Sequence, residues 1–277
     1  MKIARHWTRV REEFDGLRVT ARGWSDDSVD SAREKARDIA RRVAERIVNG
    51  FTQKNRYLYG DRPLPEPVIR EFAGGVVTRN SYGALILNTD RLMFVDVDRP
   101  AQSSSSNGGG GGFFASLFAR PKPPAPAPPD PLIAAMKNVA ARHNLSGRLY
   151  ETAAGYRLMI TSAPFKAGTN ETEALLAEFR ADPLYMRLCR LQESFRARLT
   201  PKPFRIDSRN PPVEFPFETA ADQAKHDRWV AEYNKKSAQF STCRLLENLG
   251  RDVAPEFSEL IEYHDLETKA ASGLPLA

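Results

Sequence analysis

The first part of the chain changes from alternating to helical spacing of its apolar residues. Residues 17–24 place apolar and polar side chains in alternation, which predicts a short strand. After N-cap candidates at Ser25–Ser28, apolar residues recur every three or four positions until Asn49-Gly50. This spacing predicts an amphipathic helix of about 20 residues whose apolar stripe faces a sheet. Its polar side carries Arg33, Arg37, Arg41 and Arg46.

Three short apolar runs in the middle of the chain predict consecutive strands. They cover residues 75–80, 84–88 and 92–98. Strands so close in the sequence favour an antiparallel meander. The residues that we expect to flank the end of the third strand in such a meander are Arg79, Asn80 and Tyr82.

The second half of the chain predicts further helices and strands. Helical spacing covers residues 131–143, 171–179, 183–196 and 220–238. Other apolar runs predict a hairpin at 148–161 and strands at 242–246 and 260–264. A Pro-rich segment at 200–207 predicts an extended basic stretch. Together with the first half, this pattern predicts an α+β fold in which a mostly antiparallel sheet is packed by helices.

A Ser/Gly/Pro-rich insertion at residues 100–131 separates the two halves of this domain, residues 1–99 and 132–277. Its Ser/Gly and Pro runs are typical of flexible and polyproline-like linkers, which cannot build a core. Between them lies an apolar stretch that we expect to dock onto a protein partner, to pack back onto this chain or to touch a membrane surface. Its large apolar residues include Phe113, Phe114, Leu117 and Phe118.

The composition is typical of a soluble globular protein, with 41% hydrophobic and 27% charged residues among 277. No apolar run approaches the roughly 20 residues that span a bilayer, and the N-terminus lacks a signal-peptide core, so we expect a cytoplasmic protein without integral membrane contact. Cys189 and Cys243 have no metal-site or disulfide-framework spacing.

Basic residues outnumber acidic ones in residues 1–60 and 182–209, within a net charge of +6. Local basic surfaces suit phosphate-bearing ligands or nucleic acid. For the first of these two segments, a solvated helix face explains the charge equally well.

Two carboxylates end the strand expected at residues 92–98. Side chains alternate between the faces of a strand, so Asp96 and Asp98 point the same way. Like charges on one face repel unless a cation or hydrogen-bond donors compensate them, and carboxylate oxygens suit Mg²⁺ or Mn²⁺. We therefore expect a metal site here; the alternative is a solvated strand end that caps the turn at Pro100.

The order of three short motifs resembles the catalytic core of archaeo-eukaryotic primases and primase-polymerases. The motifs are Asp96-x-Asp98 on one strand, Gly155-Tyr156-Arg157 on a later hairpin strand, and Ile206-Asp207 after a basic segment. The resemblance implies a primase-like, RRM-like core in which Asp96 and Asp98 bind metal and Asp207 supplies a third acidic ligand. Arg157 stands where that family has a histidine.

The leading hypothesis is a divalent-metal-dependent nucleotidyltransferase or nucleic-acid-processing protein, with Asp96, Asp98 and Asp207 as catalytic residues. Such chemistry needs cations that bind phosphate. Besides Arg79, Asn80 and Tyr82, the candidate substrate-binding residues are Arg157, Arg196, Arg198, Lys202 and Arg205.

Two alternatives stay open. One is a non-catalytic protein on the same fold that binds nucleic acid or a protein partner. The other is a nucleotide-sugar-dependent glycosyltransferase, in which an Asp-x-Asp strand end binds Mn²⁺ and a diphosphate.

Overall fold

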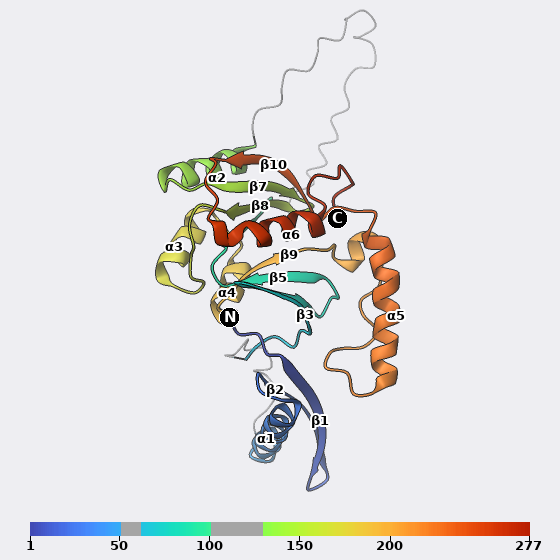
Figure 1. Cartoon of the computed structure of the whole chain (residues 1–277). Coiled ribbons are helices and arrows are strands. Elements are labelled where there is room, and N and C mark those ends of the chain that lie inside the picture. The colour runs from blue at the N-terminus through green and yellow to red at the C-terminus, as the bar shows by residue number, and fades with distance from the viewer. Residues whose placement is uncertain (51–61, 101–129) are drawn as a thin grey trace, which may run out of the picture.

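Antiparallel sheets packed by helices form the α+β fold of this protein (Figure 1), as the sequence predicted. The computed structural model describes residues 1–50, 62–100 and 130–277. None of the helices in these ranges combines the length and hydropathy needed to cross a membrane. The apolar residues expected to dock onto a partner, Phe113, Phe114, Leu117 and Phe118, lie outside the described ranges.

One four-stranded sheet has the order β3-β4-β5-β9. Its members are β3 (Val68–Phe72), β4 (Gly75–Arg79), β5 (Leu85–Thr89) and β9 (Phe195–Arg198). All neighbours in this sheet are antiparallel, so β9 joins the earlier hairpin strands from more than a hundred residues away. The first two strands of the expected meander are confirmed here.

A second four-stranded sheet has the order β10-β7-β8-β6. Its members are β6 (Phe94–Asp98), β7 (Gly147–Thr152), β8 (Gly155–Ile160) and β10 (Cys243–Leu249). The meander predicted to continue into β6 is therefore wrong at its last step. Because β4 and β9 occupy both edges of β5, β6 pairs with β8 of the other sheet instead.

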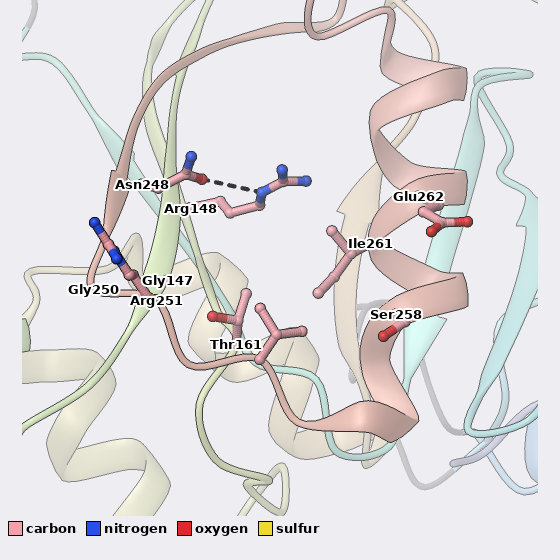
Figure 2. Close-up of a pocket in the computed structure, with 10 residues that line it drawn as sticks. Gly147, Arg148, Thr161, Asn248, Gly250, Arg251, Ser258, Ile261 and Glu262 are labelled. Carbon is pink, nitrogen blue, oxygen red and sulfur yellow. Dashed lines mark hydrogen bonds between the residues drawn. The ribbon is translucent and has the colours of Figure 1, made fainter.

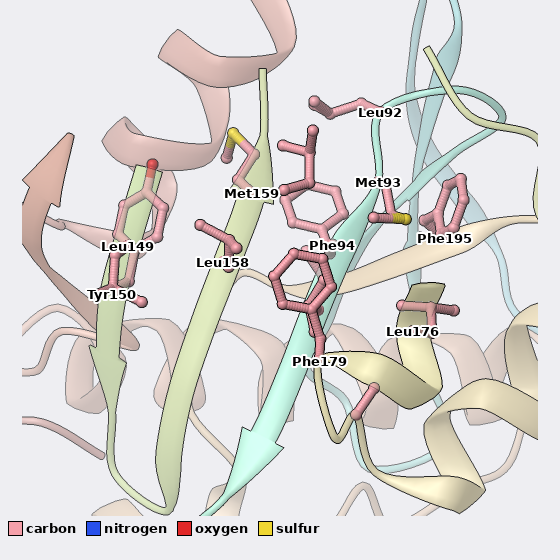
Figure 3. Close-up of a cluster of buried hydrophobic side chains, with 14 of the residues drawn as sticks. Leu92, Met93, Phe94, Leu149, Tyr150, Leu158, Met159, Leu176, Phe179 and Phe195 are labelled. Carbon is pink, nitrogen blue, oxygen red and sulfur yellow. The ribbon is translucent and has the colours of Figure 1, made fainter. Parts of the chain in front are cut away.

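Buried side chains from both sheets form one core (Figure 3). Phe94, Leu158 and Tyr150 from the second sheet are fully buried, as is Phe195 at the start of β9. Burying one such side chain contributes about 2 kcal/mol. Around them pack α2 (Pro131–Arg142), α3 (Asn170–Glu178), α4 (Pro183–Gln192) and α6 (Ser258–Thr268).

Helix α6 lies across the junction of the two sheets (Figure 1). It corrects the strand expected at 260–264. Its buried residues, Leu260, Ile261, His264 and Thr268, recur every three or four positions, which is helical spacing. His264 packs against Phe94 and Tyr150 of the second sheet, while Tyr263 packs against Phe72 of the first.

The segment between α4 and α5 (Ala220–Ser237) differs in detail from its prediction. Helix α4 ends at Gln192 instead of continuing to 196, because Glu193 adopts the left-handed conformation and β9 begins at Phe195. The stretch expected to be extended at 200–207 contains a short 3-10 helix, η2 (Pro203–Ile206). Helix α5 itself is confirmed.

An N-terminal unit of β1 (His6–Phe14), β2 (Leu17–Ser25) and α1 (Val29–Val48) projects beyond the first sheet (Figure 1). Helix α1 buries a stripe of alanines, Ala32, Ala36, Ala40 and Ala44, against the β1–β2 hairpin. The close approach requires Gly23, where an added Cβ would lie 2.0 Å from the carbonyl oxygen of Ala32. The larger apolar residues of the predicted stripe, such as Val43 and Ile47, are exposed.

Candidate functional site

The Asp96 carboxylate forms a two-point ion pair with Arg157. The two residues are direct neighbours in the antiparallel register of β6 and β8. Arg157 Nε donates to Asp96 Oδ1 at 2.7 Å and Nη2 donates to Oδ2 at 3.0 Å. Arg157 is 1% exposed, while the Asp96 side chain is 30% exposed. Burial alone would lower the pKa of Arg157, but Asp96 raises it above its ordinary value, so the guanidinium stays charged.

The remaining donors of Arg157 join the second sheet to the first sheet and to α6. Its Nη1 donates to the carbonyl of Arg198 at 3.0 Å, at the end of β9, and lies 3.4 Å from His264 Nε2. Burial lowers the pKa of His264, so the ring is neutral and accepts at Nε2. Its Nδ1 then donates to Asp265 Oδ1 at 2.9 Å.

Asp265 closes this buried network. It accepts from the hydroxyl of Tyr150 at 2.6 Å and from Arg148. Although burial by itself would raise the pKa of Asp265, the hydrogen bonds from His264 and Tyr150 hold it below its ordinary value. Asp96 and Arg157 therefore belong to a network that is structural in character, with its polar groups paired inside the protein.

Asp98 differs from Asp96 in its surroundings. It lies two positions further along β6, opposite Gly155, and is exposed. Alternation along the strand places it on the face that carries Asp96. Burial lowers the pKa of Lys202, and the charge of Asp98 opposes that lowering. Asp98 is therefore the more accessible acidic residue of the predicted pair.

The acidic residues on the described part of the chain do not gather into a multidentate metal centre. In residues 1–50, 62–100 and 130–277, no group of three or more His, Cys, Asp or Glu side chains is placed to hold an ion. Asp207 is exposed, has a left-handed backbone and caps the end of η2. A metal ion at Asp96 would have to share both carboxylate oxygens with Arg157. The donor set therefore does not fit a metal held by three acidic ligands, and Mg²⁺ or Mn²⁺ binding stays a prediction.

Three of the predicted cations gather beyond the end of β9. Arg198 is the last residue of β9. Lys202 directly precedes η2, and Arg205 lies within it. Burial lowers the pKa of Arg198 to about 10, helped by the charge of Arg157 and opposed by Asp96. Burial also lowers the pKa of Lys202, and both Arg198 and Arg205 lower it further. We call Arg198, Lys202 and Arg205 the cation cluster.

The cation cluster is short of anionic partners. Arg198 Nε is buried and has no hydrogen-bond partner among the described residues. The carboxylates that act on the cluster are Asp96, which is already paired with Arg157, and Asp98. Cations that repel one another in a partly desolvated position are stabilised when an anion binds between them.

An exposed aromatic ring lies within the cation cluster. Phe204 is 67% exposed, and the charged ends of Lys202 and Arg205 lie 5.8 and 5.9 Å from its ring centre. Sequence reasoning did not select Phe204. The available signal was a large apolar side chain inside the basic Pro-rich segment 200–207, where no helical or strand period assigns it to the core.

The other predicted binding residues lie elsewhere or are paired. Arg196 is buried and donates to both carboxylate oxygens of Glu66, at 2.8 and 3.0 Å, and to Asn88 at 2.6 Å. Arg79 donates to the carbonyl of Gly83 at 2.6 Å, in the β4–β5 turn. The guanidinium of Arg196 is therefore not free for phosphate, and Arg79 is only 8% exposed.

Asn80 and Tyr82 also belong to the β4–β5 turn. The Asn80 side-chain oxygen accepts from the backbone amides of Tyr82 and Ala84, at 3.1 and 3.0 Å. Arg79 and Asn80 line a small pocket with Phe215 and His226. The expectation that this turn flanks the Asp-bearing strand end depended on the meander, which the structure replaces with two sheets.

A larger groove lies between β7, β10 and α6. Its volume is about 550 Å³, and Arg148 and Asn248 line one side while Ile261 lines the other (Figure 2). Arg148 donates to Asn248 at 3.2 Å and also contacts Asp265. Neither Asp98 nor a member of the cation cluster lines this groove, so it is separate from the predicted site.

Comparison with protein-family models, with curated proteins and with solved structures finds no match for this chain.

Proposed function

We propose that this protein binds nucleic acid through its phosphate groups, which the cation cluster of Arg198, Lys202 and Arg205 holds beside the end of β6. The observation that carries the proposal is the buried Nε of Arg198, which has no hydrogen-bond partner among the described residues and lies close to the charges of Lys202 and Arg205. Phosphate oxygens are strong acceptors for guanidinium groups, and a nucleic-acid backbone offers them in series.

Binding is better supported than metal-dependent catalysis. The residue that the primase-like hypothesis needs first, Asp96, has both carboxylate oxygens engaged by Arg157. Breaking that pair to release the carboxylate would leave a guanidinium that is 1% exposed without its counter-charge. Asp98 is exposed and has its charge close enough to act on Lys202 of the cation cluster.

The test is binding of a labelled oligonucleotide, measured by fluorescence anisotropy for the wild type and two variants. We expect Arg205→Ala to weaken binding about tenfold, corresponding to about one lost charge-assisted phosphate contact. Arg198→Met keeps the length of the partly buried side chain and should weaken binding at least as much. Arg91→Ala is the matched control, because Arg91 is an exposed arginine just before the opposite end of β6.

Equal affinities for the wild type and Arg205→Ala would contradict the proposal, as would an equal loss in Arg91→Ala. Circular dichroism and thermal unfolding of each variant separate loss of binding from loss of fold.

Metal-dependent nucleotidyl transfer is the second candidate. The observation that favours it is the shared face of Asp96 and Asp98, with Asp98 exposed next to the cation cluster. On this hypothesis, we expect a nucleoside triphosphate to raise the unfolding temperature of the wild type only when Mn²⁺ is present. This stabilisation should disappear in Asp98→Asn. If the triphosphate stabilises the wild type equally with and without Mn²⁺, phosphate binding alone accounts for the site.

A further inference from the structure

The exposure of Phe204 is not explained by packing within the described residues. Its neighbours in η2, Pro203 and Ile206, are buried, whereas the Phe204 ring is 67% exposed. An exposed Phe loses the burial free energy of about 2 kcal/mol that its ring would gain in a core. The ring points outward from a turn whose other apolar residues point inward.

The turn that carries Phe204 is firmly held. The amides of Arg205 and Ser208 donate to the carbonyls of Lys202 and Pro203, each at 2.9 Å. Beneath them Ile206 packs with Tyr233. The Tyr233 hydroxyl lies 2.8 Å from Thr200 Oγ1 and 2.6 Å from the Pro201 carbonyl. The ring is therefore presented by a fixed backbone, which lowers the entropic cost of binding a flat ligand.

We infer that Phe204 is a stacking platform for a base of single-stranded nucleic acid whose phosphates lie on the cation cluster. This inference rests on the proposed function and adds the kind of nucleic acid. Aromatic side chains next to basic side chains bind single strands, because every base has a face that can stack. Lys202 and Arg205 lie on either side of Phe204 in the chain, so phosphates can be held near the stacked base.

A duplex does not suit this arrangement. Its bases are stacked on one another, and their faces are closed to a side chain except where a base is splayed out. Phosphate contacts, by contrast, are available on single strands and duplexes alike. Phe204 should therefore contribute to single-strand affinity while the cations contribute to both.

The experiment compares Phe204→Ala and Phe204→Trp with the wild type on three probes: labelled oligothymidylate, a duplex of comparable length, and inorganic tripolyphosphate. We expect Phe204→Ala to weaken oligothymidylate binding about tenfold and to leave binding of the duplex and of tripolyphosphate unchanged. Phe204→Trp should retain or strengthen single-strand binding. Arg205→Ala should weaken binding of all three probes.

The outcomes separate the two proposals. If Arg205→Ala weakens binding while Phe204→Ala matches the wild type on oligothymidylate, the stacking inference is wrong and the phosphate site stands. An equal loss on single strand and duplex in Phe204→Ala also overturns it. If the wild type binds none of the three probes, both proposals are wrong. Because Phe204 is exposed, Phe204→Ala should unfold at the wild-type temperature, and a large drop would instead indicate a structural role.

Discussion

At the scale of single residues, the two aspartates of β6 have different tasks although they are two positions apart. Asp96 neutralises Arg157 inside the protein, and Asp98 faces solvent beside Lys202. Matched substitutions of the two therefore separate a structural charge from a surface charge.

Asp96→Asn should lower the free energy of unfolding by about 3 kcal/mol, because it leaves the guanidinium of Arg157 buried without its counter-charge. Asp98→Asn should change it by less than about 0.5 kcal/mol, as expected for an exposed side chain. Urea denaturation of both variants gives the comparison. Equal stability of the two would mean that the ion pair contributes little to the fold.

The neutral His264 predicts a pH dependence of stability. Its pKa is lowered in the folded protein from an ordinary value of 6.5 by burial. The unfolded chain therefore takes up the extra proton first as the pH falls. The contribution of the neutral His264 ring to the free energy of unfolding is therefore fully present above about pH 6.5 and declines as the pH falls below that value.

His264→Asn should be less stable than the wild type but should show a shallower fall in unfolding free energy between pH 7 and pH 5. Thermal or urea unfolding at several pH values measures the slope. Burial also lowers the pKa of His226. Unfolding of His226→Asn at the same pH values therefore shows how much of the pH dependence comes from that ring. A slope as steep in His264→Asn as in the wild type would exclude His264 as its source.

How far the site could be predicted follows from which contacts are local. That Asp96 and Asp98 lie on one face depends only on the alternation of side chains along a strand, so the sequence alone predicts it. The Asp96–Arg157 pair depends on the register between strands 61 residues apart, which no local pattern specifies. For the same reason Arg196 was taken as a phosphate ligand, since its partner Glu66 lies 130 residues away.

Among the helices and strands, the spacing of apolar residues and the length of the segment predicted the element correctly where only one face of it is buried. The β7–β8 hairpin was predicted from two short apolar runs around a turn, although every residue of β8 is buried. Helix α5 was predicted from one-faced spacing, whereas α6 was mistaken for a strand because residues 260–264 are too few to show a helical period. Its buried set continues to Thr268 at helical spacing. Strand β1 was missed, and with it the hairpin that α1 covers.

The contact of α1 with that hairpin is the most sensitive point of the N-terminal unit. Gly23→Ala should destabilise this unit by about 2–3 kcal/mol, because the new methyl group overlaps the backbone of α1 at Ala32 and Ala36. Hydrogen exchange should then rise in residues 17–44 and stay unchanged in β6 and β8. Thr20→Ala, at an exposed position of the same strand, is the control. Unchanged exchange in residues 17–44 of Gly23→Ala would contradict this close packing.

At the scale of the whole molecule, the cation cluster lies where the two sheets meet. Arg157 of the second sheet donates to the carbonyl of Arg198 in the first, and β6 touches β9. The junction thus positions the proposed ligand site, and neither sheet contains it alone.

Salt should reveal how many phosphates the site holds. The logarithm of the binding constant should fall linearly with the logarithm of salt concentration, because bound cations release counterions. Removing Arg205 should make that slope shallower by about one unit, whereas Arg91→Ala should leave it unchanged. Titrations of oligothymidylate at several salt concentrations test this, and parallel lines for the wild type and Arg205→Ala would exclude a phosphate contact at Arg205.

Tyr156 ties together the point where the chain leaves the second sheet after β6 and the point where α2 begins. Its hydroxyl donates to Asp130 at 2.6 Å and accepts from Arg99 at 2.8 Å. Asp130 also caps the start of α2, and Arg99 directly follows β6. Because one side chain holds both Arg99 and Asp130, we expect the sheet to keep its structure when the number of residues between these two is changed. The segment between Arg99 and Asp130 is accordingly a suitable place to insert a reporter domain or to divide the protein into two complementing fragments.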